Sequence, residues 1–134
     1  MNVVDIEKRL REFFRRQSRD VVAAYLFGSV ARGDAHPQSD VDVGVLFEKS
    51  PPPTLEGLSL RLEGELEAYL GCPVQVVDLN GAPVDLTHRV LRDGKLLHDA
   101  DPALRIRFEV RVRNEFFDVE PYLKEYRRIT KVAP

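Results

Sequence analysis

The sequence is short of the features that mark secreted and membrane proteins. Its single cysteine, Cys72, cannot form a disulfide within the chain. The longest apolar run, VVAAYLF at 21–27, falls far below the ~20 residues that a membrane-spanning helix needs. The amino-terminal segment carries acids and bases where a signal peptide would have an apolar core. We therefore expect a soluble, cytoplasmic protein without a membrane partner.

An excess of charge of one sign is missing as well. The formal net charge is −2, and acids and bases are interspersed along the chain. Composition therefore gives no reason to expect direct binding to nucleic acid or to an anionic membrane surface. The sequence also lacks a Walker A loop, a GxGxxG fingerprint and a Ser-His-Asp set, and its three histidines are scattered without metal-ligand spacing.

Length and periodicity predict one small domain with helices and strands. At 134 residues the chain suffices for one hydrophobic core, so we expect 1–134 to form a single domain. The patterns predict helices at 3–16, 54–70 and 83–92, and strands at 21–27, 41–47, 73–79 and 95–98. Three consecutive prolines break the chain at 51–53. This order favours an α/β or α+β fold, a small mixed sheet with helices packed on it.

The carboxyl-terminal part fits two patterns. RIRFEVRVR at 105–113 alternates as a strand would, yet Leu104, Phe108, Val112 and Phe116 also form a helical stripe. We expect a helical segment at about 102–132, because turn signals are absent as far as Pro121. Such a helix has a second apolar stripe, with Ile106, Val110 and Phe117. That stripe is either additional core or a contact surface for a partner.

Two carboxylates stand at the start of the second predicted strand. Successive side chains of a strand point to opposite faces, so Asp40 and Asp42 share one face while Val41 and Val43 enter the core. The two acids, about 7 Å apart, repel each other, and a Mg²⁺ ion would offset that repulsion. Asp78 ends a later apolar run, and three carboxylates on adjacent strands could hold two metal ions across one phosphate.

A Gly-Ser pair directly after the first strand supplies the complementary feature. If a helix begins near Ser29, its free backbone N–H groups and the serine hydroxyl face an incoming anion. Gly28 would let the backbone approach a phosphate closely. Arg32, one turn into that helix, could add a charge-assisted contact.

The combined motif resembles a known family. FGSVARGDAHPQSDVDVGVLF is similar to the signature of the DNA polymerase β-like nucleotidyltransferases, and within them to the minimal nucleotidyltransferase (MNT) domain proteins of prokaryotes. The matching positions are Gly28, Ser29, Ala31, Arg32, Gly33, Asp34, Ser39, Asp40 and Asp42, with Asp78 as the third acid. The resemblance implies the palm-like fold of that superfamily, a small mixed sheet flanked by helices.

The resemblance also implies roles for these residues. Asp40, Asp42 and Asp78 would be ligands of two Mg²⁺ ions, and Asp78 would also accept the proton of the attacking hydroxyl. Gly28, Ser29 and Arg32 would bind the triphosphate of ATP. The hydroxyl would attack the α-phosphate, and pyrophosphate would leave.

A protein partner follows from the same resemblance. MNT proteins of this size are often encoded beside a HEPN-domain toxin, and such an antitoxin neutralises the toxin by placing AMP on a tyrosine. Three alternatives stay open: transfer to a small molecule, a non-catalytic module that neutralises its partner by occupying it, and a nucleotide sensor. The sequence leaves open the acceptor, the nucleotide base, the number of groups transferred and the stoichiometry.

Overall fold

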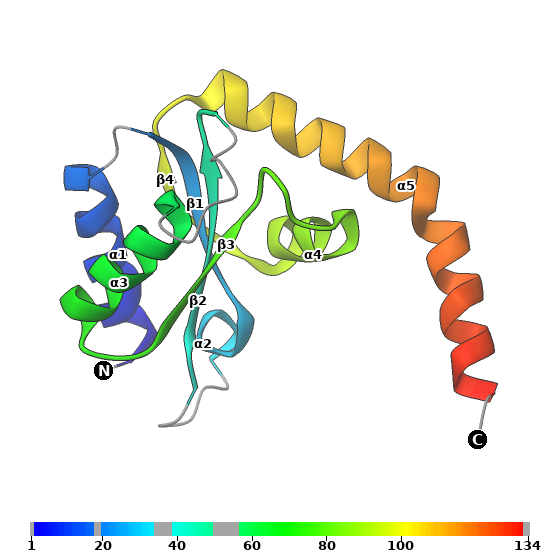
Figure 1. Ribbon diagram of the computed structural model, residues 1–134, viewed down its shortest axis with the longest axis horizontal. Helices are drawn as coiled ribbons and strands as arrows, with labels where there is room; N and C mark the ends of the chain where they lie inside the picture. Colours follow the sequence, from blue (N-terminus) through cyan, green and yellow to red (C-terminus); the bar gives the residue numbers. More distant parts are fainter. Residues whose placement is uncertain (1, 18–19, 34–38, 50–56, 133–134) are drawn as a thin grey trace.

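The computed structural model describes residues 2–17, 20–33, 39–49 and 57–132 (Figure 1). The elements in chain order are α1 (Val3–Gln17), β1 (Val21–Phe27), α2 (Gly28–Arg32), β2 (Val41–Phe47), α3 (Leu58–Leu70), β3 (Val74–Asp78), α4 (Val84–Asp93), β4 (Lys95–Asp99) and α5 (Pro102–Val132). The proline break at 51–53, the first part of the helix expected at 54–70 and Asp34 of the motif lie outside the described residues.

The strands form one mixed sheet in the order β3-β2-β1-β4. β1 pairs antiparallel with both β2 and β4, whereas β2 and β3 run parallel. A parallel pair needs a crossover connection, and α3 provides it. The expected small mixed sheet with flanking helices is therefore confirmed. This topology brings the end of β1 and the starts of β2 and β3 to the same end of the sheet.

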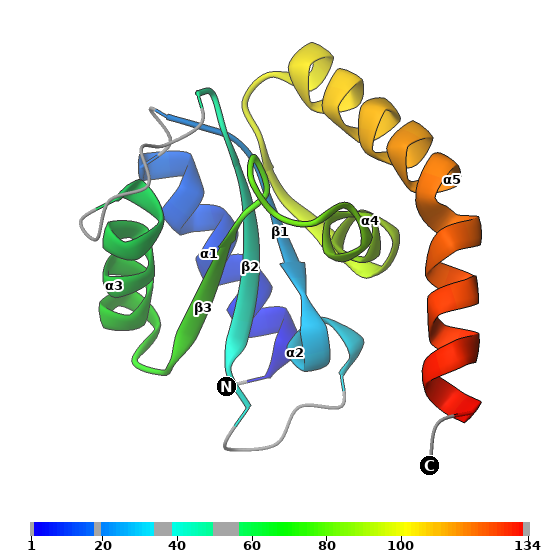
Figure 2. The same ribbon diagram turned by 45° about the vertical axis from the view of Figure 1, so that its right-hand side comes forward.

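Helices α1 and α3 cover one face of the sheet (Figures 1 and 2). The apolar stripe expected on the first helix is buried there, and so are alternate residues of β2. The buried residues of these three elements are Ile6, Leu10, Phe13, Phe14, Val41, Val43, Val45, Phe47, Leu62, Leu66 and Leu70. The strand alternation expected for 41–47 is therefore confirmed.

Helix α3 also satisfies backbone groups on the outer edge of β3. The Glu63 carboxylate accepts a hydrogen bond from the Val76 N–H at 3.0 Å, and the Glu67 carboxylate accepts one from the Val74 N–H at 3.4 Å. β3 is the last strand on its side of the sheet, so these N–H groups have no neighbouring strand to pair with.

The other face of the sheet is covered by α4 and by the first half of α5 (Figures 1 and 2). Val90 of α4 and Phe108 and Val112 of α5 are buried against Tyr25 and Leu46 of the sheet. The stretch at 105–113, which fitted both a strand and a helix, is helical. Of its two apolar stripes, the one with Phe108 and Val112 faces the core.

The second stripe of α5 is exposed. Ile106, Val110 and Phe117 keep 50%, 46% and 69% of their surface accessible. Helix α5 bends near its middle, and its carboxyl-terminal half turns downward in the view of Figure 2. Pro121 lies inside α5, and a proline within a helix removes one backbone hydrogen bond, which accounts for a bend. No helix within the described ranges is both long and apolar enough to cross a membrane.

A charged cluster fixes α5 to the sheet. Arg105 pairs with Asp99 of β4 at 3.0 Å and with Glu109 at 2.7 Å. Glu109 also accepts a hydrogen bond from the Tyr25 hydroxyl at 3.0 Å. Burial, and next the charge of Glu109, raises the pKa of Tyr25, so the phenol stays protonated and remains a donor.

The attachment of α5 gives a first testable prediction. Phe108→Ala should lower the free energy of unfolding by about 3 kcal/mol, because it removes a ring buried between α5 and the sheet. Phe117→Ala, on the same helix, should change it by less than about 0.5 kcal/mol, because that ring is exposed. Chemical denaturation measures both values. Equal effects of the two variants would contradict the assignment of the buried stripe.

Candidate active site

The strand pairing places the Gly28-Ser29 pair beside the carboxylates of Asp40 and Asp42. Phe27, the last residue of β1, lies opposite Asp42 of β2, and Gly28 begins α2 directly afterwards. The start of β2 and the short helix α2 accordingly lie at the same end of the sheet (Figure 1). Phe27 is the helix cap residue and makes no side-chain capping bond. The first N–H groups of α2 therefore lack the usual side-chain acceptor.

Gly28 is in close contact with Asp42. Its φ is +78°, in the left-handed region that favours glycine, and a Cβ atom there would lie 2.2 Å from Oδ2 of Asp42. The absence of a side chain at this position is what allows the carboxylate to lie against the start of α2. A glycine is therefore required here for two reasons, the backbone conformation and the space that Asp42 occupies.

The electrostatics of Asp42 involve the other motif residues. Partial burial raises the pKa of Asp42, the neighbouring Asp40 carboxylate raises it further, and Arg32 lowers it. The structure thus brings Asp40, Asp42 and Arg32 within electrostatic reach of one another, with Gly28 and Ser29 next to them. Five of the six residues expected in the site are gathered at this end of the sheet.

Asp78 is not among them, so the arrangement differs from the site expected from the sequence. In the parallel pair of β2 and β3, Asp42 lies opposite Gln75, whereas Asp78 lies opposite Val45. Asp78 is thus three residues farther along the sheet than Asp42. At about 3.3 Å per residue this displacement is roughly 10 Å, too far for both acids to bind one ion.

The direction of the side chain separates Asp78 from the site as well. Val74 and Val76 pack into the core beneath α1 and α3, and by alternation Asp78 points to that same face, opposite to Asp42. Its Oδ1 accepts a hydrogen bond from the Asn80 N–H at 2.9 Å. Among the residues that the structure describes, no group of three or more His, Cys, Asp or Glu side chains could hold a metal ion.

Gln75 is the β3 residue that lies opposite Asp42, and the sequence interpretation did not single it out. It is exposed, and the register places it beside Asp42. The only signal in the sequence is its polarity within the apolar run VQVVD. Its polarity can be related to the site only when β3 is known to run parallel to β2, because that pairing places Gln75 opposite Asp42.

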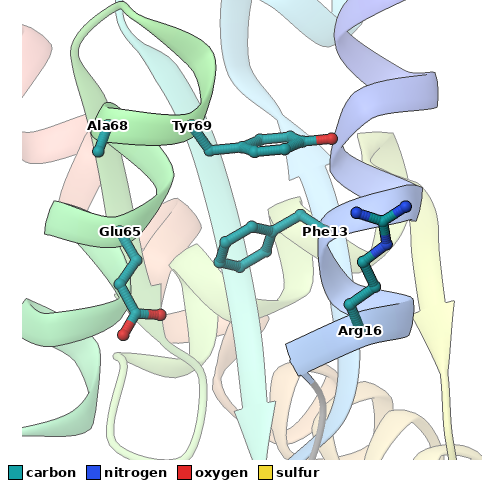
Figure 3. Close-up of a pocket in the computed structure, with 5 residues that line it drawn as sticks. All are labelled: Phe13, Arg16, Glu65, Ala68 and Tyr69. Atoms are coloured by element: carbon teal, nitrogen blue, oxygen red, sulfur yellow. The ribbon is translucent and has the colours of Figure 1, made fainter.

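A cavity of about 430 Å³ lies between α1 and α3, on the face of the sheet away from Asp42. Figure 3 shows its lining: Phe13 and Arg16 come from α1, and Glu65, Ala68 and Tyr69 come from α3. The rings of Phe13 and Tyr69 contact each other, with centroids 5.4 Å apart. None of the motif residues reaches this cavity.

The fold and the Gly-Ser and Asp-x-Asp geometry define the class of protein. The family described as "Polymerase beta, Nucleotidyltransferase" matches residues 8–103, and the chain belongs to this family. Helix α5 lies almost wholly beyond the matched residues.

One relative is the protein adenylyltransferase MntA of Shewanella oneidensis, which is 32% identical over 92 residues. The match covers 68% of this chain and 63% of that protein, so the chain spans less than two thirds of the relative's length.

Two solved structures share the fold. A chain in the crystal structure of a toxin-antitoxin with AMP-PNP has a TM-score of 0.78 and 23% identity, covering 94% of this chain and 98% of that chain. A chain in the structure of the tri-AMPylated Shewanella oneidensis HEPN toxin in complex with MNT antitoxin has a TM-score of 0.74 and 20% identity, covering 97% and 99%. These likenesses show that α5 belongs to the shared fold.

The contact between Gly28 and Asp42 gives a second prediction. Gly28→Ala and Gly33→Ala both place a side chain at a left-handed backbone position, which costs about 1 kcal/mol of stability each. Only Gly28→Ala should also displace Asp42, because a Cβ at Gly33 meets no atom within 4 Å. Nuclear magnetic resonance should therefore show the Asp42 amide signal shifted in Gly28→Ala and unchanged in Gly33→Ala. An unchanged Asp42 signal in both variants would contradict the contact.

Proposed function

We propose that the chain is a Mg²⁺-dependent nucleotidyltransferase that transfers AMP from ATP to a tyrosine hydroxyl of a HEPN-domain toxin, and that it acts as the antitoxin of that toxin. The observation that carries the proposal is the Asp42 carboxylate lying against Gly28 at the start of α2. A carboxylate that can bind a cation therefore lies beside the start of a helix that has no side-chain cap, as a metal-bound triphosphate requires.

The pair Asp40 and Asp42 fits a Mg²⁺ ion. Mg²⁺ is usually bound through one or two carboxylates, with substrate phosphates and water completing its shell. The repulsion that raises the pKa of Asp42 is the interaction that a cation would relieve. When bound, Mg²⁺ neutralises triphosphate charge and orients the leaving group. Because Asp78 is on the other face, two carboxylates support one ion, and the second ion implied by the resemblance has no third acid.

The other motif residues bind the nucleotide. The N–H groups at the start of α2, which lack a side-chain cap, and the Ser29 hydroxyl donate to phosphate oxygens, and Arg32 adds positive charge close to Asp42. Holding the triphosphate in this way exposes the α-phosphorus to an acceptor hydroxyl. The hydroxyl oxygen attacks the α-phosphorus and releases its proton to solvent, the bond to the bridging oxygen breaks, and pyrophosphate leaves while AMP stays on the acceptor.

A protein acceptor accounts for the exposed side of α5. The apolar residues Ile106, Val110 and Phe117 are accessible on one helix, as expected for a surface that binds a partner. The relative MntA is a protein adenylyltransferase, which supports transfer to protein over transfer to a small molecule and over a module that neutralises by binding alone.

The proposal predicts that Asp42→Asn abolishes transfer without unfolding the protein. Incubation of the chain and its co-purified partner with Mg²⁺ and ATP labelled at the α-phosphate should label the partner, and γ-labelled ATP should not. Asp42→Asn should lower the rate of transfer by at least about a hundredfold, because the site loses one of the two carboxylates that bind Mg²⁺. Glu65→Gln, which removes an exposed carboxylate on α3, serves as the matched control and should keep the wild-type rate.

Thermal unfolding without metal supplies an independent check on the same variant. The pKa of Asp42 is raised in the folded state, so ionisation of this carboxyl opposes folding. The free energy of unfolding therefore falls as the pH rises from the pKa of the unfolded chain through the higher pKa of the folded protein. Asp42→Asn should therefore unfold at a higher temperature than wild type at pH 7. Retained transfer in this variant would refute the assignment of the site.

A further inference from the structure

Gln75 lies in a row of residues that crosses the sheet at the candidate active site. Phe27 of β1 lies opposite Asp42 of β2, and Asp42 lies opposite Gln75 of β3. Paired residues on neighbouring strands are separated by about 5 Å and point to the same face. Gln75 is therefore the nearest β3 side chain to Asp42 on the face that carries the site.

Two further observations support a role in ligand binding. Gln75 is exposed, so nothing in the core requires or restrains its side chain. β3 is an edge strand, so Gln75 borders the open side of the site. The one acid of β3, Asp78, is three residues away along the sheet and has its Oδ1 bonded to Asn80.

A carboxamide differs from a carboxylate in its affinity for cations. Its carbonyl oxygen can bind a divalent ion, but it brings no negative charge, and divalent-cation affinity rises with the number of charged ligands. A site made of Asp40, Asp42 and Gln75 carries a charge of −2 when both acids are ionised. Such a site should bind a cation weakly until a triphosphate adds its own oxygens and charge.

We propose that Gln75 is the third side chain of the metal-binding site, and that the site takes its cation together with the triphosphate because this position holds an amide. The inference rests on the proposed function for the identity of the nucleotide and the cation. It concerns Gln75, to which the motif assigns no role, and it makes Asp78 a structural residue.

Binding of Mn²⁺, measured by electron paramagnetic resonance on the full chain, tests the proposal with and without a non-hydrolysable ATP analogue. Wild type should bind Mn²⁺ weakly alone and at least about tenfold more tightly with the analogue. Gln75→Glu, which exchanges the amide for an acid of the same size, should bind Mn²⁺ alone about tenfold more tightly than wild type. Asp78→Asn should bind it as wild type does.

Two controls give the result its meaning. Asn114→Asp adds one negative charge on an exposed position of α5 and should leave the Mn²⁺ affinity unchanged. Asp42→Asn should abolish binding of Mn²⁺ alone. The unfolding temperature of each variant shows that it is folded.

The outcomes separate this inference from the proposed function. If Asp42→Asn binds Mn²⁺ as tightly as wild type, the metal site of the proposed function is wrong. A second outcome would overturn only the role of Gln75. In that case Asp42→Asn and Asp78→Asn would both lose Mn²⁺ binding, and Gln75→Glu would bind Mn²⁺ as wild type does. If Asn114→Asp raised the Mn²⁺ affinity as much as Gln75→Glu does, the role of Gln75 would be overturned too, because the gain would then come from the overall charge of the protein.

Discussion

The candidate active site depends on one steric constraint, the contact between a residue without a side chain and a carboxylate on the neighbouring strand. Antiparallel pairing of β1 and β2 brings Gly28 to Asp42, and the left-handed backbone of Gly28 turns the chain into α2 at that point. A larger residue there would clash with the acid. The backbone N–H groups of α2, Ser29 and Arg32 all owe their positions beside the carboxylates to this turn.

The rest of the fold offsets the unfavourable charge at this end of the sheet. Burial and Asp40 both raise the pKa of Asp42, so the metal-free site opposes folding at neutral pH. The opposite face of the same strand buries Val41, Val43 and Val45 beneath α1 and α3. One face of β2 thus contributes hydrophobic stabilisation along its length, whereas the start of the other face carries carboxylate charge that Arg32 offsets only in part.

Local patterns were sufficient to predict much of this arrangement. The alternation of valines with other residues at 41–45 identified β2 and the face of Asp42, and the Gly28-Ser29 pair located the start of α2, because both patterns depend on neighbours in sequence. The position of Asp78 relative to Asp42 could not be predicted from VQVVD, because strand direction and register depend on the crossover through α3. For α5, periodicity gave both stripes, but only tertiary packing determines that Phe108 is buried and Phe117 exposed.

The two glutamates of α3 that bond to β3 also determine how copies of this protein can associate. An uncovered sheet edge is a template on which another chain can add a strand, which leads to domain swapping or aggregation. Here the Val74 and Val76 N–H groups already have acceptors in Glu63 and Glu67, which also bring negative charge to that border. An approaching strand would have to displace both carboxylates. The edge beside Gln75 is thus protected against intermolecular β-sheet growth while its other face remains accessible to ligand.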